Sequence, residues 1–242
     1  MSEIGLLLGL AIIAFLYASV GHGGASGYIT LLTLAGVSTV AVRPSSLMLN
    51  LCVSAIAFVQ FARAGHFRWK VFWPFAMLSV PMAWAGANIT LHPDLFRKLL
   101  ALCLLFAVAR MTFPSDRVAL EPRPMAWPVA MIIGLVIGLV SGLIGIGGGI
   151  ILSPILLLAG WADAKTTAAT SALFILVNSA AGLLSMADHG QLQTMGSMSW
   201  PMAAIGGGLL GSWVGARKLV DERVRQALGV VLFLAAIKLW WT

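Results

Sequence analysis

"GHGGASGYITLLTLAG" (residues 21–36) and "GIGGGIILSPILLLAG" (residues 145–160) share one plan. Each stretch begins with a cluster of glycines and continues with a short apolar run. That run has about thirteen residues, whereas a helix needs roughly 20 to cross the hydrocarbon core of a bilayer. The two stretches therefore predict two short helices, each beginning at a glycine turn, among longer apolar segments.

The composition is that of an integral membrane protein. The 242 residues are 60% hydrophobic and 10% charged, and the mean hydropathy is +0.98. The net charge of +7 comes from short loops between apolar segments, so it indicates membrane topology and not a nucleic-acid groove. Cys52 and Cys103 lie far apart within apolar segments, which predicts neither a disulfide framework nor a metal site.

The chain contains an internal duplication. Apolar segments fall at 4–20, 24–36, 44–62, 70–91 and 96–113, and again at 129–144, 148–160, 167–186, 198–216 and 226–241. An offset of about 124 residues aligns the two glycine clusters, and slightly larger offsets align Trp73-Pro74 with Trp200-Pro201 and Asn50 with Asn178. We therefore expect an N-terminal repeat (1–113), a cytoplasmic linker (114–128) and a C-terminal repeat (129–242).

The loop charges predict that the two repeats are inverted. Residues 63–70 carry three basic side chains, whereas the equivalent loop, 187–199, carries none. The bias is reversed one loop later, where residues 217–225 carry four. By the positive-inside rule, 63–70, the linker and 217–225 face the cytoplasm and both termini face the periplasm. The predicted fold is an all-α membrane protein of two inverted repeats, each of about five helical segments.

The first two segments of each repeat have about seventeen and thirteen residues. Their helices would be ~25 and ~20 Å long, which is shorter than the ~30 Å core of a bilayer. We expect a short helical hairpin that dips into the membrane and returns, with its glycine turn buried. Two short, tilted crossings are the alternative, and they give the same inverted topology.

The glycine turns are the candidate substrate site. Freed N–H groups of a turn inside the membrane must line a cavity or be buried in protein, and a helix N-terminus carries partial positive charge. Two such N-termini meeting near the midplane would bind an anion. The alternative is that the glycines only allow close helix packing. The candidate residues in these stretches are Gly21, His22, Gly23, Gly24, Ser26, Gly145, Gly147, Gly148 and Gly149.

The third segments add polar candidates, namely Ser46 and Asn50 in the first repeat and Thr170, Ser171 and Asn178 in the second. Their side chains can hydrogen-bond a sulfonate or carboxylate oxygen, or join helices to one another. His22 would pack or respond to pH, and Arg43 would anchor the interface or attract anions.

Several features exclude other classes of function. All eight acidic residues fall in predicted loops or at segment ends, which argues against a cation pathway. Ser26 and Ile150 stand where a nucleotide-binding G-x-G-x-x-G would need its last glycine. We find no nucleophile–base pair, so we expect no enzyme activity, no cofactor and no metal.

The chain resembles the TauE/SafE sulfite exporter family over nearly its whole length. The resemblance rests on residues 21–36 with "RPSSLMLN", and on "SGLIGIGGGIILSPILLLAG" with "TAATSALFILVNSAAG". The first glycine motif departs from the typical pattern at His22 and Ala25. The resemblance implies a multi-pass carrier of the bacterial inner membrane that moves sulfite, sulfonates or related organic anions.

We therefore predict a secondary transporter that exports small sulfur-containing anions by alternating access. The alternatives are an anion channel and a carrier of another small organic anion. The expected partners are the small anionic substrate and the lipid bilayer, without nucleic acid. The oligomeric state stays open, a homodimer included.

Overall fold

The computed structural model describes residues 2–89, 102, 124–190, 192 and 196–218. The helices are α1 (Glu3–Ala18), α2 (Ala25–Leu34), α3 (Thr39–Arg63), α4 (Trp69–Ala87), α6 (Trp127–Ile144), α7 (Gly149–Ala159), α8 (Ala164–Asp188) and α9 (Ser199–Arg217). The all-helical prediction is confirmed, and the helix bounds agree with the predicted segments to within a few residues. The predicted segments 96–113 and 226–241 and most of the linker lie outside the described residues.

Within the described ranges, α3, α6 and α8 are long and apolar enough to cross a membrane. By contrast, α1, α2 and α7 are shorter apolar helices of 16, 10 and 11 residues. The short helices predicted after the glycine turns are therefore present.

Local sequence explains where the helices around these turns begin and end. Ser2 caps α1 by accepting a hydrogen bond from Gly5 N, and Asp163 caps α8 by accepting one from Thr166 N at 2.7 Å. In contrast, α2 and α7 begin after Gly24 (φ 102°) and Gly148 (φ 76°) and have no side-chain cap. The left-handed conformation at these two positions favours glycine. Since glycine has no side chain, neither short helix is capped by its own N-cap residue.

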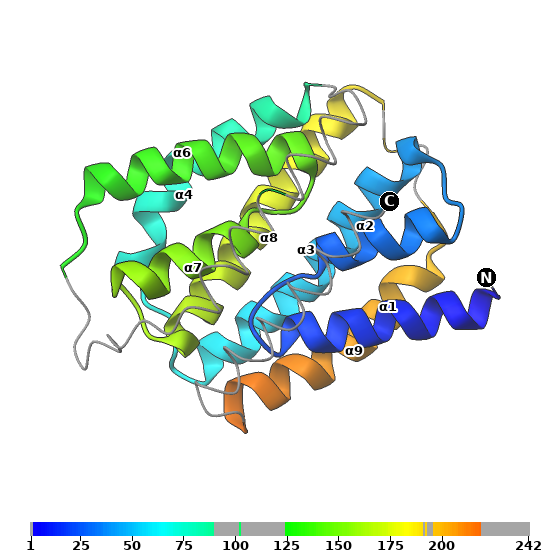
Figure 1. Cartoon of the computed structure of the whole chain (residues 1–242), viewed down its shortest axis with the longest axis horizontal. Coiled ribbons are helices and arrows are strands. Elements are labelled where there is room, and N and C mark those ends of the chain that lie inside the picture. The colour runs from blue at the N-terminus through cyan, green and yellow to red at the C-terminus, as the bar shows by residue number, and fades with distance from the viewer. Residues whose placement is uncertain (1, 90–101, 103–123, 191, 193–195, 219–242) are drawn as a thin grey trace.

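The equivalent helices α3 and α8 lie in the middle of the molecule and run antiparallel (Figure 1). Near the start of α3, Leu47 packs with Leu183 near the end of α8. Near the end of α3, Phe61 packs with Ala168 near the start of α8. Contacts that lie further along α3 therefore lie further back along α8, as expected of antiparallel helices.

Two glycine-rich seams flank this central pair, with α4 beside α6 on one side and α1 beside α9 on the other (Figure 1). In the α4–α6 seam, a Cβ on Gly134, Gly138 or Gly142 would collide with the carbonyl oxygens of Phe75, Ser79 and Ala83 respectively. In the α1–α9 seam, a Cβ on Gly207, Gly211 or Gly215 would collide with those of Ala11, Phe15 and Ser19.

The numbers rise together on both helices of each seam, so the helices within a seam are parallel. Each seam joins the first helix of one repeat to the fourth helix of the other. Small residues that allow close backbone approach are the usual means of joining helices in a membrane.

The apolar core and the apolar surface are both extensive. The core between α1, α2, α3 and α9 includes Leu10, Tyr28, Leu32 and Val53, all buried. On the outside of α1, every fourth residue is an exposed aliphatic side chain, namely Ile4, Leu8 and Ile12. Such a stripe is expected of a helix that faces lipid.

Candidate functional site

Asn50 of α3 joins the two glycine turns, which we define as residues 21–24 (first turn) and 145–148 (second turn). Its side chain is fully buried. Asn50 Oδ1 accepts a hydrogen bond from Ala25 N, the first residue of α2, at 3.1 Å. Asn50 Nδ2 donates to Ile146 O of the second turn at 3.2 Å and to Ser179 Oγ of α8 at 3.3 Å. One amide therefore connects the start of one short helix, the opposite turn and the other repeat.

The two turns need glycine because they approach Asn50 closely. A Cβ on Gly23 would overlap Asn50 Oδ1. A Cβ on Gly147, where φ is +74°, would lie 2.7 Å from Asn50 Nδ2 and 2.9 Å from Ser179 Oγ. Close approach at Gly23, and both close approach and backbone conformation at Gly147, therefore require glycine.

His22 extends the first turn toward α7. Its Nδ1 lies 3.0 Å from Val20 O, and its Nε2 lies 3.1 Å from Ser153 Oγ and 3.2 Å from Gly149 O. Ser153 Oγ also lies 2.7 Å from Ser171 Oγ of α8. Each ring nitrogen faces a backbone carbonyl, Val20 O at Nδ1 and Gly149 O at Nε2, and a carbonyl can pair only with a ring N–H, so these contacts do not select one tautomer of the ring. His22 is thus part of a buried polar chain of three side chains.

Asn178, the sequence equivalent of Asn50, does not reach either turn. Asn178 Nδ2 donates to Phe174 O on its own helix at 2.8 Å, and its Oδ1 accepts from Ser79 Oγ of α4 at 2.7 Å. This residue joins α8 to α4. The structure therefore separates two asparagines that the repeat alignment treats as equal.

The remaining predicted site residues lie around the same centre or within the same helices. Ser26 pairs with Tyr17 of α1, with 2.7 Å between the two hydroxyl oxygens. Ser46 and Thr170 are fully buried, and their hydroxyls have no hydrogen-bond partner among the described residues. The other predicted glycines are at the turns or begin α7, and a Cβ there would meet Ala168 for Gly21, Tyr28 for Gly24, Arg43 for Gly145, Phe174 for Gly148 and Ile175 for Gly149.

Sequence reasoning missed four polar side chains of this centre. Tyr17, Ser79, Ser153 and Ser179 bond directly to predicted site residues. Ser153 stands alone in the apolar run after the second glycine cluster, and Tyr17 is one of two tyrosines in the chain. Their position, one helical turn from a glycine cluster, was the sequence signal that could have predicted Tyr17 and Ser153 as part of the polar centre.

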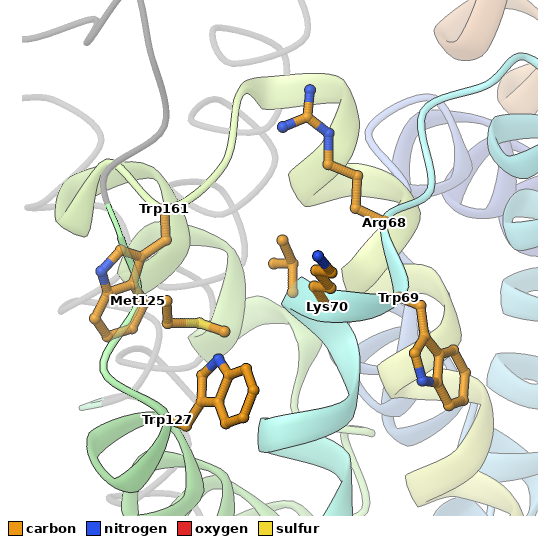
Figure 2. A pocket seen from close by; sticks show the side chains of 7 residues that line it. Arg68, Trp69, Lys70, Met125, Trp127 and Trp161 are labelled. Atoms are coloured by element: carbon orange, nitrogen blue, oxygen red, sulfur yellow. The ribbon is translucent and has the colours of Figure 1, made fainter.

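A surface pocket of about 460 Å³ lies at the far end of α7 from the second turn. Figure 2 shows Met125, Trp127 and Trp161 along one side and Arg68, Trp69 and Lys70 along the other. Since α7 has 11 residues, the pocket lies roughly 16 Å along that helix from the turn. Its lining combines two cationic side chains with three tryptophans.

The described part of the site is polar but holds few side chains of the metal-binding types. Across the ranges that the structure covers, no three His, Cys, Asp or Glu side chains gather as metal ligands would. The described acidic residues, Glu3, Asp163 and Asp188, are all at helix ends. The central polar groups are amides, hydroxyls, one imidazole and backbone N–H groups.

Comparison with known proteins places this helical membrane protein in the class of membrane transporters. A family model described as "Sulfite exporter TauE/SafE" matches residues 6–239. The chain is 37% identical over 242 residues to the "Probable membrane transporter protein y4hK" of Sinorhizobium fredii (strain NBRC 101917 / NGR234), covering 98% of each protein. No solved structure matches the chain significantly.

The chain belongs to the TauE/SafE sulfite exporter family. It is a multi-pass membrane transporter and not an enzyme.

Proposed function

We propose that this protein is a secondary transporter that exports small sulfur-containing anions, such as sulfite or organosulfonates, by alternating access between two inverted repeats. The observation that carries the proposal is the position of Asn50, whose amide bonds to the start of α2 and to the turn before α7. Both short helices therefore point their N-terminal ends toward one buried centre. The family description supplies the sulfite class of substrate.

The centre suits an anion. Neither α2 nor α7 is capped by the side chain of its own N-cap glycine, and Asn50 Oδ1 takes only one of the first N–H groups of α2. Partial positive charge and N–H donors therefore remain at both N-terminal ends. No carboxylate of the described residues lies at the centre to repel an anion. Export of one negative charge also gains ~2.3 kcal/mol at a membrane potential of 100 mV, inside negative.

The helix directions support inverted repeats. Equivalent helices of two inverted repeats point in opposite directions across the membrane. The central pair, α3 and α8, is antiparallel, and the two seams join reciprocal helices of the two repeats. Within the first repeat, α1 and α2 also run antiparallel, since Gly9 faces Leu31 whereas Gly27 faces Ile13. This direction fits a hairpin that enters the membrane and returns.

The predicted orientation places the tryptophan-lined pocket on the cytoplasmic side of the inner membrane. Arg68 and Lys70 would attract anions there, at the end of α7 opposite the second glycine turn. An anion entering from the cytoplasm would then move along α7 toward the buried centre.

Labelling of single cysteines in intact cells tests the orientation. In a chain with Cys52 and Cys103 replaced by serine, we expect a cysteine at His66 to be protected from an impermeant maleimide. A cysteine at Gly190 should react. External labelling at position 66 would overturn the proposed topology, including the periplasmic termini.

Counterflow in proteoliposomes tests the transport proposal. Vesicles loaded with unlabelled sulfite should transiently accumulate external radiolabelled sulfite, because a carrier exchanges substrate across an alternating site. A channel gives no counterflow, so simple equilibration at much higher rates would favour the channel. A melting temperature raised by sulfite and methanesulfonate salts, and not by chloride salts of small organic cations, would support the anion class independently.

A further inference from the structure

Arg43 is a mostly buried cation beside the second glycine turn. It lies one turn into α3, where its Nη2 donates to Ala87 O at the end of α4 and to Gly142 O near the end of α6. A Cβ on Gly145 would lie 2.9 Å from Arg43 Cγ and 3.6 Å from its Nε. The guanidinium therefore sits between two helix C-termini and the turn that leads into α7.

The charge of Arg43 has no full counter-ion in the described structure. Its partners are two backbone carbonyls, and no carboxylate among the described residues forms an ion pair with it. Its Nε is buried and without a hydrogen-bond partner among those residues. The C-terminal ends of two helices offset only part of a unit charge. A buried cation without an anionic partner is costly inside a membrane protein and typically marks a functional site.

A second unpaired donor lies on the same face of α3. Arg43, Ser46 and Asn50 are spaced i, i+3 and i+7, which places all three on one face of a helix. Ser46 is fully buried, and its hydroxyl has no hydrogen-bond partner among the described residues. Arg43 contacts the second turn at its start and Asn50 contacts it at Ile146, so this face of α3 lies against the turn.

We propose that Arg43 and Ser46 form an oxyanion subsite against the second glycine turn, in which a sulfite or sulfonate group accepts hydrogen bonds from Arg43 Nε and Ser46 Oγ. The inference rests on the proposed function, since it makes Arg43 the positive charge that pairs with the transported anion. Guanidinium–oxyanion pairs combine charge with directed N–H donors and are stronger than neutral hydrogen bonds. The subsite lies toward the start of α3, which the loop charges place on the periplasmic side. In an exporter it would hold the anion on its way out.

Titration calorimetry of the purified full-length protein with sodium sulfite and with methanesulfonate tests the subsite. Arg43→Met should weaken binding by about tenfold or more, because it removes both the charge and the donor. Arg43→Lys, which keeps the charge but has no Nε–H, and Ser46→Ala should each weaken binding by about threefold. Arg63→Met is the matched control, since it removes an exposed cation at the other end of α3 and should leave the affinity unchanged.

The outcomes separate the subsite from a structural role and from the proposed function. If Arg43 only caps α4 and α6, folded Arg43→Met melts at a lower temperature but binds sulfite like the wild type, which overturns the subsite. Equal weakening by Arg63→Met and Arg43→Met also overturns it. If Arg43→Met does not fold, unchanged affinity in both Arg43→Lys and Ser46→Ala has the same consequence. Absence of binding by the wild type overturns the proposed function itself.

Discussion

The two glycine turns occupy equivalent places in the two repeats but differ in backbone and in surroundings. Gly147 has positive φ, whereas its equivalent Gly23 does not. The first turn carries His22, whose ring reaches Ser153 of α7. At the equivalent position the second turn carries Ile146, whose side chain lies in the apolar core and whose carbonyl accepts from Asn50. The first turn therefore contributes a polar side chain to the centre, and the second contributes backbone.

The third helices show the opposite asymmetry. Gly145 of the second turn faces Arg43 of α3, whereas the equivalent Gly21 faces the backbone of Ala168 in α8. Each turn thus packs against the third helix of the other repeat, but only one of them meets a cation there. The two halves therefore share the packing of a turn against the opposite third helix, while the polar side chains differ between them. An anion at this centre would have the imidazole of His22 on the side of the first turn and the guanidinium of Arg43 on the side of the second turn.

The largest expected effect comes from adding a methyl group in the first turn. Gly23→Ala places a methyl group on Asn50 Oδ1, so the link between the turns must break. We expect transport of radiolabelled sulfite in proteoliposomes to fall by roughly a hundredfold, since small misplacements of a binding site have large effects on rate.

Gly36→Ala is the control for this change. Gly36 also has positive φ (+80°), but nothing lies within 4 Å of an added Cβ. It should cost only about 1 kcal/mol of stability through backbone strain and keep transport. Full transport by folded Gly23→Ala would reduce the first turn to a packing motif.

The second expected effect distinguishes the two asparagines. Asn50→Ala removes three hydrogen bonds at the junction of both turns and should lower the free energy of unfolding by about 3 kcal/mol, against about 1 kcal/mol for Asn178→Ala. Reversible unfolding in mixed micelles measures both values. Equal losses would contradict the asymmetry and return the two residues to equivalent roles.

The third expected effect compares the seams. Gly138→Ala and Gly211→Ala each place a Cβ against a backbone carbonyl of the parallel partner helix. Forcing these helices apart should cost about 2 kcal/mol in either case. The melting temperatures of the two variants should therefore fall by similar amounts. A loss in only one variant would show that the seams, like the turns, are not equivalent.

The smallest effect is expected on the outer surface. Ile12 on α1 and Ile132 on α6 are 58% and 63% exposed. Replacing either by alanine removes apolar surface that faces lipid in both folded and partly unfolded states, so stability should change by less than about 0.5 kcal/mol. A larger change in thermal stability would indicate that protein, in a homodimer or elsewhere in the chain, covers that face.

Sequence alone predicts the turns and the short helices, because both are encoded locally. A glycine cluster before thirteen apolar residues specifies a turn and a helix that is too short to span. The same locality explains the predicted bounds of α3 and α8. The seams were not predicted, although the glycines at 134, 138 and 142 and at 207, 211 and 215 are visible in the sequence. Their spacing marks a close contact but does not name the partner helix.

The polar centre was predicted only in part for a related reason. Asn50 and Asn178 occupy equivalent positions in the repeats, and nothing in their neighbours indicates that one faces the turns and the other faces Ser79. Arg43 is adjacent to a proline near the start of its helix, where an interfacial arginine is usual. Its burial depends on the ends of α4 and α6, which only the three-dimensional arrangement brings to it.

The two seams also differ in how long the first helix of each must wait for its partner during synthesis. In each seam the three evenly spaced glycines lie on the helix that is made second, α6 after α4 and α9 after α1, and only the α4–α6 seam adds a glycine on the first helix, Gly86, among the described residues. Roughly 60 residues separate Phe75 from Gly134, but roughly 200 separate Ala11 from Gly207. At ~5–20 residues per second of translation, α4 waits about 3–12 s for its partner and α1 about 10–40 s. The strip of Ala11, Phe15 and Ser19 on α1 therefore waits longer for its partner than the equivalent strip on α4, and lipid or the insertion machinery is expected to cover it until α9 is made.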